Sequence, residues 1–238
     1  MQRLFIPTLG PTDWRRLLAN PRTQWVPGKS ALESAVAWES AREMEDGLPE
    51  SVRDLLATHD ATSGAQLVLG LPELQVEFAG GGHPSQTDLW ALLRTEAHFI
   101  SASFEAKSGE SLGEIVGDWL AAAPPRSGRP ARLRDLGQRL GFVDSEAVDI
   151  RYQLLHRAAT ATKLAARFRA EYAVLVVHSF GGTRDAPSLA DFRKFGEFMG
   201  ASVRENVLAP VARSCECPLL IGWLADTPAT EAQLRDAI

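Results

Sequence analysis

The hydrophobic and polar positions between residues 88 and 107 follow the pattern of two short β-strands. The first run, Asp88-Leu-Trp-Ala-Leu-Leu, is apolar after its first residue and is followed by a polar break at 94–97. The second run alternates, so that one strand face carries a shared set of side chains: Phe99, Ser101, Ser103, Glu105 and Lys107. If the two runs pair about the polar break, the numbers of cross-strand partners sum to about 192 or 193, and opposed side chains lie roughly 5 Å apart. The pattern therefore places Asp88 beside Phe104 or Glu105.

An amphipathic helix is predicted from Ser30 to about Asp46, before these strands. Ser30 with Glu33 three residues later has the spacing of a capping box, and Gly47 and Pro49 follow as stop signals. Glu39 lies largely with the apolar stripe of this helix, where an uncompensated buried carboxylate is costly. Two interpretations stay open: Glu39 approaches the acids of the hairpin as a further metal or water ligand, or it reaches out into water at the edge of the stripe.

The rest of the chain continues as a mixture of helices and strands. The other predicted helices cover residues 51–58, 111–120, 130–140, 146–168 and 188–201, and the other predicted strands cover 66–69, 74–78, 172–180 and 218–224. The strand at 172–180 contains a fully apolar run, which is typical of a central strand buried on both faces. The order of elements predicts an α/β fold with a central mixed β-sheet flanked by helices.

Length and composition favour one domain over residues 1–238, with a less certain N-terminal extension (1–27) and a C-terminal strand and tail (203–238). No apolar run approaches the ~20 residues needed to cross a membrane. The first seven residues hold one cation and end at Pro7, which argues against a signal peptide. The two cysteines, Cys215 and Cys217, lack further ligands for a zinc site, so we expect ordinary thiols and a reducing cytoplasm.

The net charge of −5 argues against a protein that coats nucleic acid nonspecifically, but one segment is strongly basic. Five arginines fall within fourteen residues: Arg126, Arg129, Arg132, Arg134 and Arg139. Such a density of guanidinium groups suits contacts with nucleic-acid phosphates, the first four being the predicted contacts, and a solvated helix face is the alternative.

The acids and the lysine of the hairpin are the predicted catalytic centre. Mg²⁺ or Mn²⁺ prefers oxygen ligands, which Asp88, Glu105 and the backbone carbonyl of Ala106 can supply. Lys107 lies two residues beyond Glu105 on the same strand face and can orient a nucleophilic water or stabilise charge on phosphorus. The alternative is a surface ion pair between Lys107 and one of the acids.

An Asp on one strand and Glu-x-Lys on the returning strand resemble the PD-(D/E)xK nuclease superfamily. The resemblance implies a restriction-endonuclease-like fold, with a further acid on the helix before the hairpin and often a Gln or Lys on a later helix. Glu39 matches the early acid in placement, and Gln153 matches the later position; Gln153 alternatively satisfies backbone groups beside the sheet. Thr87 stands where the nominal signature has its proline.

Several segments also resemble a bacterial family without an assigned activity, over roughly residues 25–200. They are Gly-Lys-Ser-Ala from Gly28, Ser-Gln-x-Asp from Ser85, Glu-x-Lys from Glu105, Arg-Tyr-Gln-Leu-Leu-His-Arg from Arg151, and Val-His-Ser-Phe from Val177. We read His156 and His178 as structural histidines and His83 as a loop residue.

These features lead to the hypothesis of a metal-dependent nuclease acting on nucleic acid, with no membrane partner and with a homodimer left open. The rival hypothesis is a catalytically inactive binding module that keeps the nuclease fold for nucleic-acid or protein contact.

Overall fold

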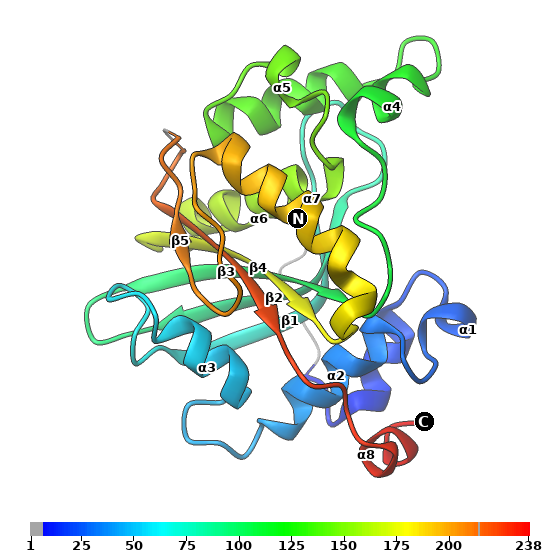
Figure 1. The fold of residues 1–238 in the computed structure, drawn as a ribbon, viewed down its shortest axis with the longest axis vertical. Helices are drawn as coiled ribbons and strands as arrows, with labels where there is room; N and C mark the ends of the chain where they lie inside the picture. Colours follow the sequence, from blue (N-terminus) through cyan, green and yellow to red (C-terminus); the bar gives the residue numbers. More distant parts are fainter. Residues whose placement is uncertain (1–6, 214) are drawn as a thin grey trace.

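The structure is a computed structural model that describes residues 7–213 and 215–238. The first six residues of the predicted N-terminal extension, on which the signal-peptide argument rests, lie outside this part of the chain. The central feature of the structure is a six-stranded mixed sheet with the order β1-β2-β3-β4-β6-β5 (Figure 1). The strands are β1 (Gln66–Val76), β2 (Ser85–Arg94), β3 (Phe99–Lys107), β4 (Tyr172–Ser179), β5 (Ala209–Pro210) and β6 (Leu219–Ala225).

The predicted hairpin and its register are confirmed. β2 and β3 pair antiparallel with Leu89 opposite Phe104, so partner numbers sum to the expected 193. β1 also pairs antiparallel with β2, and β5 pairs antiparallel with β6, whereas β4 runs parallel to both of its neighbours, β3 and β6. The parallel connection from β3 to β4 leaves the sheet and returns through helices, as parallel pairs require.

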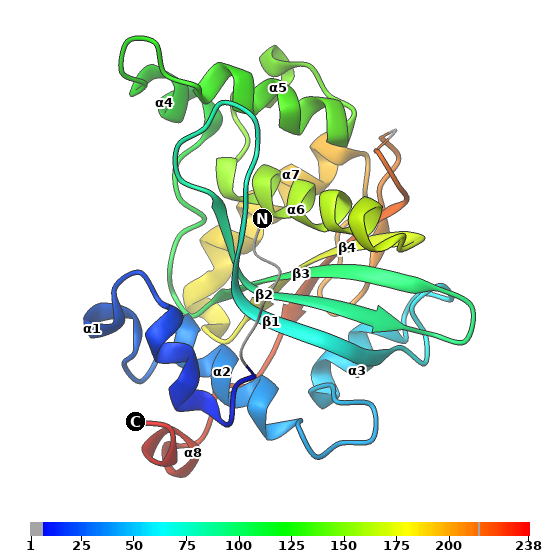
Figure 2. The same cartoon turned by 180° about the vertical axis from the view of Figure 1, so that it is seen from behind.

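Helices cover both faces of this sheet (Figures 1 and 2). The described α-helices are α1 (Pro21–Gln24), α2 (Ser30–Ser40), α3 (Glu50–Leu56), α4 (Val116–Ala121), α5 (Arg129–Leu140), α6 (Tyr152–Phe168), α7 (Ala186–Met199) and α8 (Glu231–Asp236). Short 3-10 helices span Pro11–Leu17, Asp144–Ala147 and Gly182–Asp185. In both views α4 to α7 lie on one side of the sheet and α1, α2, α3 and α8 lie on the other. The predicted fold class, a mixed α/β sheet flanked by helices, is confirmed.

The alternation along β3 decides what each layer contacts. Ile100, Ala102 and Phe104 pack into the core beside α2 and α3. Ser101 faces the opposite layer, where its hydroxyl donates to the Ala161 carbonyl of α6 at 2.8 Å. Both faces of the strand are therefore buried, and the face that carries Glu105 and Lys107 is the one covered by α6.

The helix predicted over residues 30–46 was too long, and its predicted cap was wrong. α2 ends at Ser40, and Ser30 forms no capping hydrogen bond with its side chain. The backbone N–H of Ser30 instead donates to Glu110 Oε1 at 3.2 Å, and Glu33 Oε2 accepts the N–H of Ala229 at 2.7 Å. Long-range partners thus satisfy the groups that a capping box would have joined locally.

Three other boundaries differ from the sequence prediction. The strands expected at 66–69 and 74–78 form the single strand β1, whose register shifts between Leu67 and Leu69. The helix expected from Ser111 begins only at Val116, and the helix expected from 146 begins at Tyr152. Residues 111–115 and 148–151 are held by a bridge between Ile115 and Arg151, which explains the late start of both helices.

Residues near the N-terminus pack into the core rather than extending from it. Trp14, Leu18 and Trp25 are buried against α2, and the indole of Trp25 donates to the carbonyl of Ala237 at 3.3 Å. Among the described helices, none is both long and apolar enough to cross a membrane.

Candidate active site

β2 and β3 bring Asp88, Glu105 and Lys107 together beneath α6. The β2–β3 pairing ends at Leu89 and Phe104. Just beyond it, the N–H of Ala106 donates to Asp88 Oδ2 at 2.7 Å. The Asp88 carboxylate therefore takes the place of a backbone acceptor at the end of the hairpin, which fixes it against the residue between Glu105 and Lys107.

Glu105 is at the centre of a buried ion cluster. Its Oε1 accepts from Lys107 Nζ at 2.6 Å and from Gln153 Nε2 at 2.7 Å, and its Oε2 accepts from Arg157 Nε at 2.5 Å. Glu105 is 1 % exposed, Lys107 4 % and Arg157 6 %. Gln153 and Arg157 lie four residues apart on α6, so both side chains lie on one helix face and meet the same carboxylate.

A second layer of hydrogen bonds holds Arg157. Its NH1 group donates to Ser85 Oγ at 3.2 Å and contacts His156 Nδ1 at 3.0 Å, while Ser85 Oγ lies 2.7 Å from the same Nδ1. A guanidinium can only donate, so Nδ1 is the acceptor and the neutral imidazole carries its proton on Nε2. Burial, and then the charges of Arg157, Arg132 and Lys107, hold the pKa of His156 well below its usual value, which keeps this ring neutral.

Glu73 on β1 is a third carboxylate of the cluster. Pro72 pairs with Leu89 and Leu74 with Thr87, so Glu73 stands across from Asp88 on the neighbouring strand. Its backbone adopts a φ of 53°, a left-handed conformation that non-glycine residues seldom adopt, and its side chain accepts from Gln86 Nε2 at 2.7 Å. Strained backbone of this kind is concentrated at functional sites.

The environment shifts the pKa values of the acids of the cluster in opposite directions. Burial, followed by the Glu105 charge, raises the pKa of Asp88 to about 7. Burial and the charge of Asp88 raise the pKa of Glu73 to about 8. Burial works against ionisation of Glu105 as well, but Arg157 and Lys107 outweigh it and hold its pKa below the usual range. Glu105 is therefore the ionised centre, and Asp88 and Glu73 take up protons near neutral pH.

The balance of charge bears on whether this site suits a divalent cation. Glu73, Asp88 and Glu105 face two cations, Lys107 and Arg157, so full ionisation would leave one excess negative charge. Hard oxygen donors in excess of positive charge are what Mg²⁺ prefers. Within the described ranges no group of three or more His, Cys, Asp or Glu side chains is arranged to hold a metal ion. Asp88 and Glu105 are two carboxylates on neighbouring strands, and Lys107, Gln153 and Arg157 already donate to both oxygens of Glu105.

Not every predicted site residue joins this cluster. Glu39 is half-buried, and its Oε1 accepts from the indole of Trp14 at 2.8 Å. On the same helix it is Glu33 that is buried, at 2 % exposure. Glu39 was predicted to approach the hairpin acids, but the structure shows no contact between them. The hydrogen-bond partner of its carboxylate is Trp14, from the N-terminal segment.

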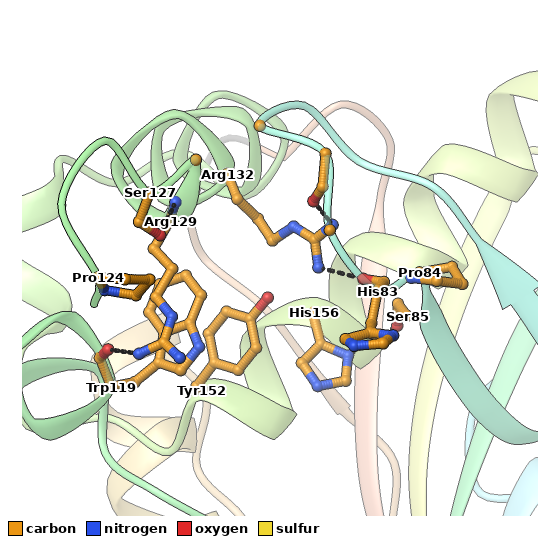
Figure 3. Close-up of a pocket in the computed structure, with 14 residues that line it drawn as sticks. His83, Pro84, Ser85, Trp119, Pro124, Ser127, Arg129, Arg132, Tyr152 and His156 are labelled. Carbon is orange, nitrogen blue, oxygen red and sulfur yellow. Dashed lines mark hydrogen bonds between the residues drawn. The ribbon is translucent and has the colours of Figure 1, made fainter. Parts of the chain in front are cut away.

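The predicted arginine patch divides into three kinds of residue. Arg129 and Arg132 line a cavity beside the cluster (Figure 3). Arg139 forms ion pairs with Asp135 and Glu216. Arg126 and Arg134 are exposed.

Sequence reasoning missed Glu73 and Arg157. The signal for Arg157 was present, since it follows Gln153 by one helical turn within a predicted helix. Glu73 fell between two predicted strands and had no signal, because its role depends on β1 running unbroken past Asp88. His156, predicted to be structural, has such a role through Ser85 and Arg157, and it also lines the cavity.

A family model described as a domain of unknown function (DUF6946) matches residues 7–228. The match covers most of the chain, and the chain belongs to that family. Searches of curated proteins and of solved structures gave no match.

Proposed function

We propose that this member of a family of unknown function is a metal-dependent nuclease that hydrolyses phosphodiester bonds in nucleic acid. The observation that carries the proposal is the buried meeting of Glu105, Lys107 and Gln153 beside Asp88. Gln153 is the residue that matches the later-helix position of the PD-(D/E)xK nucleases in sequence, and it lies 2.7 Å from the Glu105 carboxylate. The resemblance and the geometry therefore converge on one site.

Mg²⁺ or Mn²⁺ would be held by Asp88, Glu105 and the carbonyl of Ala106. When bound, such a cation neutralises phosphate charge and makes its water more acidic. Asp88 Oδ2 has one hydrogen bond from the chain, whereas both oxygens of Glu105 are occupied. To hold the cation, Glu105 would give up its contact with Lys107 or Gln153.

The residues of the chain then divide the work of hydrolysis. Lys107 would orient the attacking water or stabilise negative charge that develops on the phosphate oxygens. Arg157 keeps the Glu105 carboxylate ionised and fixed from the other side, with Ser85 and His156 holding the guanidinium. Arg157 is in this sense a positioning residue, because it acts through Glu105.

Nucleic acid is the proposed partner, and the cytoplasm is the proposed location. Arg129 and Arg132 at the cavity beside the cluster supply positive charge for a phosphate backbone. Cys215 and Cys217 are free thiols, as expected of a reducing compartment.

One observation favours a second function, the inactive binding module. Lys107, Gln153 and Arg157 already satisfy both oxygens of Glu105, as they would in an ion cluster that only stabilises the fold. A module of this kind would bind nucleic acid or protein without needing a cation.

A nuclease assay tests the proposal. The protein is incubated with plasmid and with single-stranded DNA and RNA, with Mg²⁺, Mn²⁺ or EDTA, beside the variants Lys107→Ala and Asp88→Asn. We expect cleavage that requires the cation and falls at least about 100-fold in both variants, as is typical of losing acid–base or charge-stabilising groups. Asp54→Asn, an exposed acid on α3, is the matched control. Equal activity in wild type and variants, or none in any, contradicts the proposal.

A thermal-shift titration separates the two functions. Millimolar Mn²⁺ should raise the melting temperature of the wild type, because a ligand that binds only the folded state stabilises it. The rise should disappear in Asp88→Asn and persist in Asp54→Asn. A wild type that shows no shift while still binding nucleic acid favours the binding module.

A further inference from the structure

A cavity of about 500 Å³ lies beside the carboxylate cluster (Figure 3). Its walls come from the loop 80–85 that leads into β2, from Trp119 of α4, from the start of α5, and from Tyr152 and His156 of α6. Its volume is within the range of small-molecule binding pockets.

The walls of this cavity are positively charged. Two guanidinium groups, those of Arg129 and Arg132, line it, and its lining contains no Asp or Glu. Arg132 donates to the carbonyls of Gly81 and His83, and Arg129 donates to the carbonyl of Trp119. Backbone carbonyls carry no net charge, and neither arginine forms an ion pair with the residues that the structure describes. The cavity therefore favours an anion, and planar guanidinium groups suit phosphate.

One wall carries a stacked pair of aromatic rings. Trp119 and Tyr152 lie face to face, with ring centroids 4.0 Å apart and planes at 14°. The Arg129 guanidinium lies 5.3 Å from the Trp119 ring, and the His156 ring lies 4.8 Å from Tyr152 on the other side. All four side chains are only partly buried. Flat, partly exposed aromatic groups beside guanidinium groups are the features on which unpaired nucleobases stack.

The cavity is joined to the carboxylate cluster by two shared residues. Ser85 and His156 line the cavity, and both contact NH1 of Arg157, whose Nε binds Glu105. A nucleotide in the cavity would thus lie one side-chain layer from the proposed catalytic acids.

We propose that this cavity binds one nucleotide of a single-stranded nucleic acid, its base against Trp119 and Tyr152 and its phosphate at Arg129 and Arg132. The base must be unpaired, because a base within a duplex is stacked between its neighbours and is not free to enter a cavity. The inference rests on the proposed function and narrows its substrate to single strands or frayed ends, whose adjoining phosphodiester extends toward Asp88 and Glu105.

Binding measurements in EDTA test the cavity without any cleavage. Fluorescence anisotropy measures how tightly the 238-residue chain binds four probes: a labelled single-stranded octanucleotide, its blunt duplex, an abasic strand of the same length, and a labelled mononucleotide. We expect the octanucleotide to bind at least about 10-fold more tightly than the duplex or the abasic strand. This ratio agrees with the binding free energy that stacking of one or more bases on aromatic side chains contributes. A mononucleotide that binds as tightly as the octanucleotide assigns the cavity to free nucleotides and overturns the single-strand proposal.

Variants of the stack complete the test. Trp119→Leu should lower octanucleotide affinity about 5- to 100-fold, the range expected for one stacked base, whereas Trp119→Phe should retain most of it. Arg167→Ala removes an exposed charge at the far end of α6 and is the control for general electrostatics. Melting temperatures of the variants identify a folding defect, and rescue by Phe separates stacking from packing.

Two results overturn the inference. One is equal affinity for abasic and base-containing strands; the other is an affinity that is the same in Trp119→Leu and wild type. If these occur while the wild type still cleaves with Mn²⁺, the nuclease proposal survives and only the cavity assignment fails. If binding depends on the bases but no cation gives cleavage, the cavity assignment is supported and the nuclease proposal is contradicted.

Discussion

Replacing Arg157 with Met should expose how much of the fold depends on the buried ion cluster. Met keeps much of the apolar stem of the side chain and removes only the charge and its hydrogen bonds. Glu105, 1 % exposed, would lose the 2.5 Å bond at Oε2 and would keep Lys107 and Gln153 at Oε1. The substitution therefore leaves half of a buried carboxylate without a donor.

The expected loss of unfolding free energy follows from the number of hydrogen-bond partners that Glu105 keeps. Removing one member of a buried ion pair costs about 3–5 kcal/mol, and because Lys107 still compensates the charge we take the lower end, about 3 kcal/mol. In a chain of this size each kcal/mol lowers the melting temperature by about 2–4 °C, so a fall of about 6–12 °C is expected.

Thermal unfolding followed by circular dichroism measures this fall, with Arg167→Met as the control. Arg167 is exposed in the last turn of the same helix, and surface substitutions change stability by no more than about 0.5 kcal/mol. The pKa of Glu105 is lowered in the folded protein, so its stabilising contribution is present above its usual pKa and is lost as pH falls through the folded value. The difference between variant and wild type should therefore shrink as pH falls below the usual glutamate pKa of 4.5. A melting temperature like that of Arg167→Met, or a difference that grows in acid, would refute the reasoning.

Two other predictions concern the rest of the site. Since the pKa values of Asp88 (about 7) and Glu73 (about 8) lie above those of the unfolded chain, the folded state holds extra protons, and the free energy of unfolding should fall as pH rises from 6.5 to 8. His156 and His178, whose pKa values are lowered, act in the opposite direction, but about half of their unfolded-state protons are already lost at about pH 6.5, so the two acids dominate above it. Urea unfolding within this window should therefore show a free energy of unfolding that falls as pH rises, and less steeply in Glu73→Gln; a flat or rising profile in the wild type contradicts the assignment. At Gly80 (φ 84°) an added Cβ would lie 2.1 Å from the Gly128 carbonyl, whereas at Gly82 (φ 77°) it would meet nothing within 4 Å. Gly80→Ala should therefore destabilise the protein by about 1–3 kcal/mol more than Gly82→Ala and weaken octanucleotide binding, and equal effects of the two variants would show that the loop does not pack on α5.

Much of the sheet could be predicted from the sequence because strand alternation is a local property. Successive side chains of a strand point to opposite faces, so the pattern around Glu105 assigned each residue to a face without knowledge of the fold. The polar break at 94–97 then determined the register that places Asp88 near Ala106. The placement of Asp88, Glu105 and Lys107 came from these two features, and the fold class came from the order of helices and strands.

Predictions that depended on which distant segment covers a residue were less successful. Glu39 and Glu33 lie on one helix, and the apolar stripe could not show that the first would meet Trp14 and the second the N–H of Ala229. Ser30 had the sequence of a cap, yet its N–H is bound by Glu110 from a loop eighty residues away. Hydrogen-bond partners so far apart in sequence are decided by packing, since local propensities contribute little to their choice.

By itself, the sequence determined the hairpin, the face shared by Glu105 and Lys107, and the helix that carries Gln153, because backbone geometry imposes periods of two and 3.6 residues wherever these elements form. Only the tertiary structure decided that α6 lies over that face, that Arg157 rather than solvent neutralises Glu105, and that Glu73, with its left-handed backbone in β1, stands across from Asp88. The cavity between the glycine loop and α5 also had no local signal. The physical reason is that burial on both faces of the sheet selects one arrangement of helices among many with the same local pattern, and this arrangement brings the charged groups together.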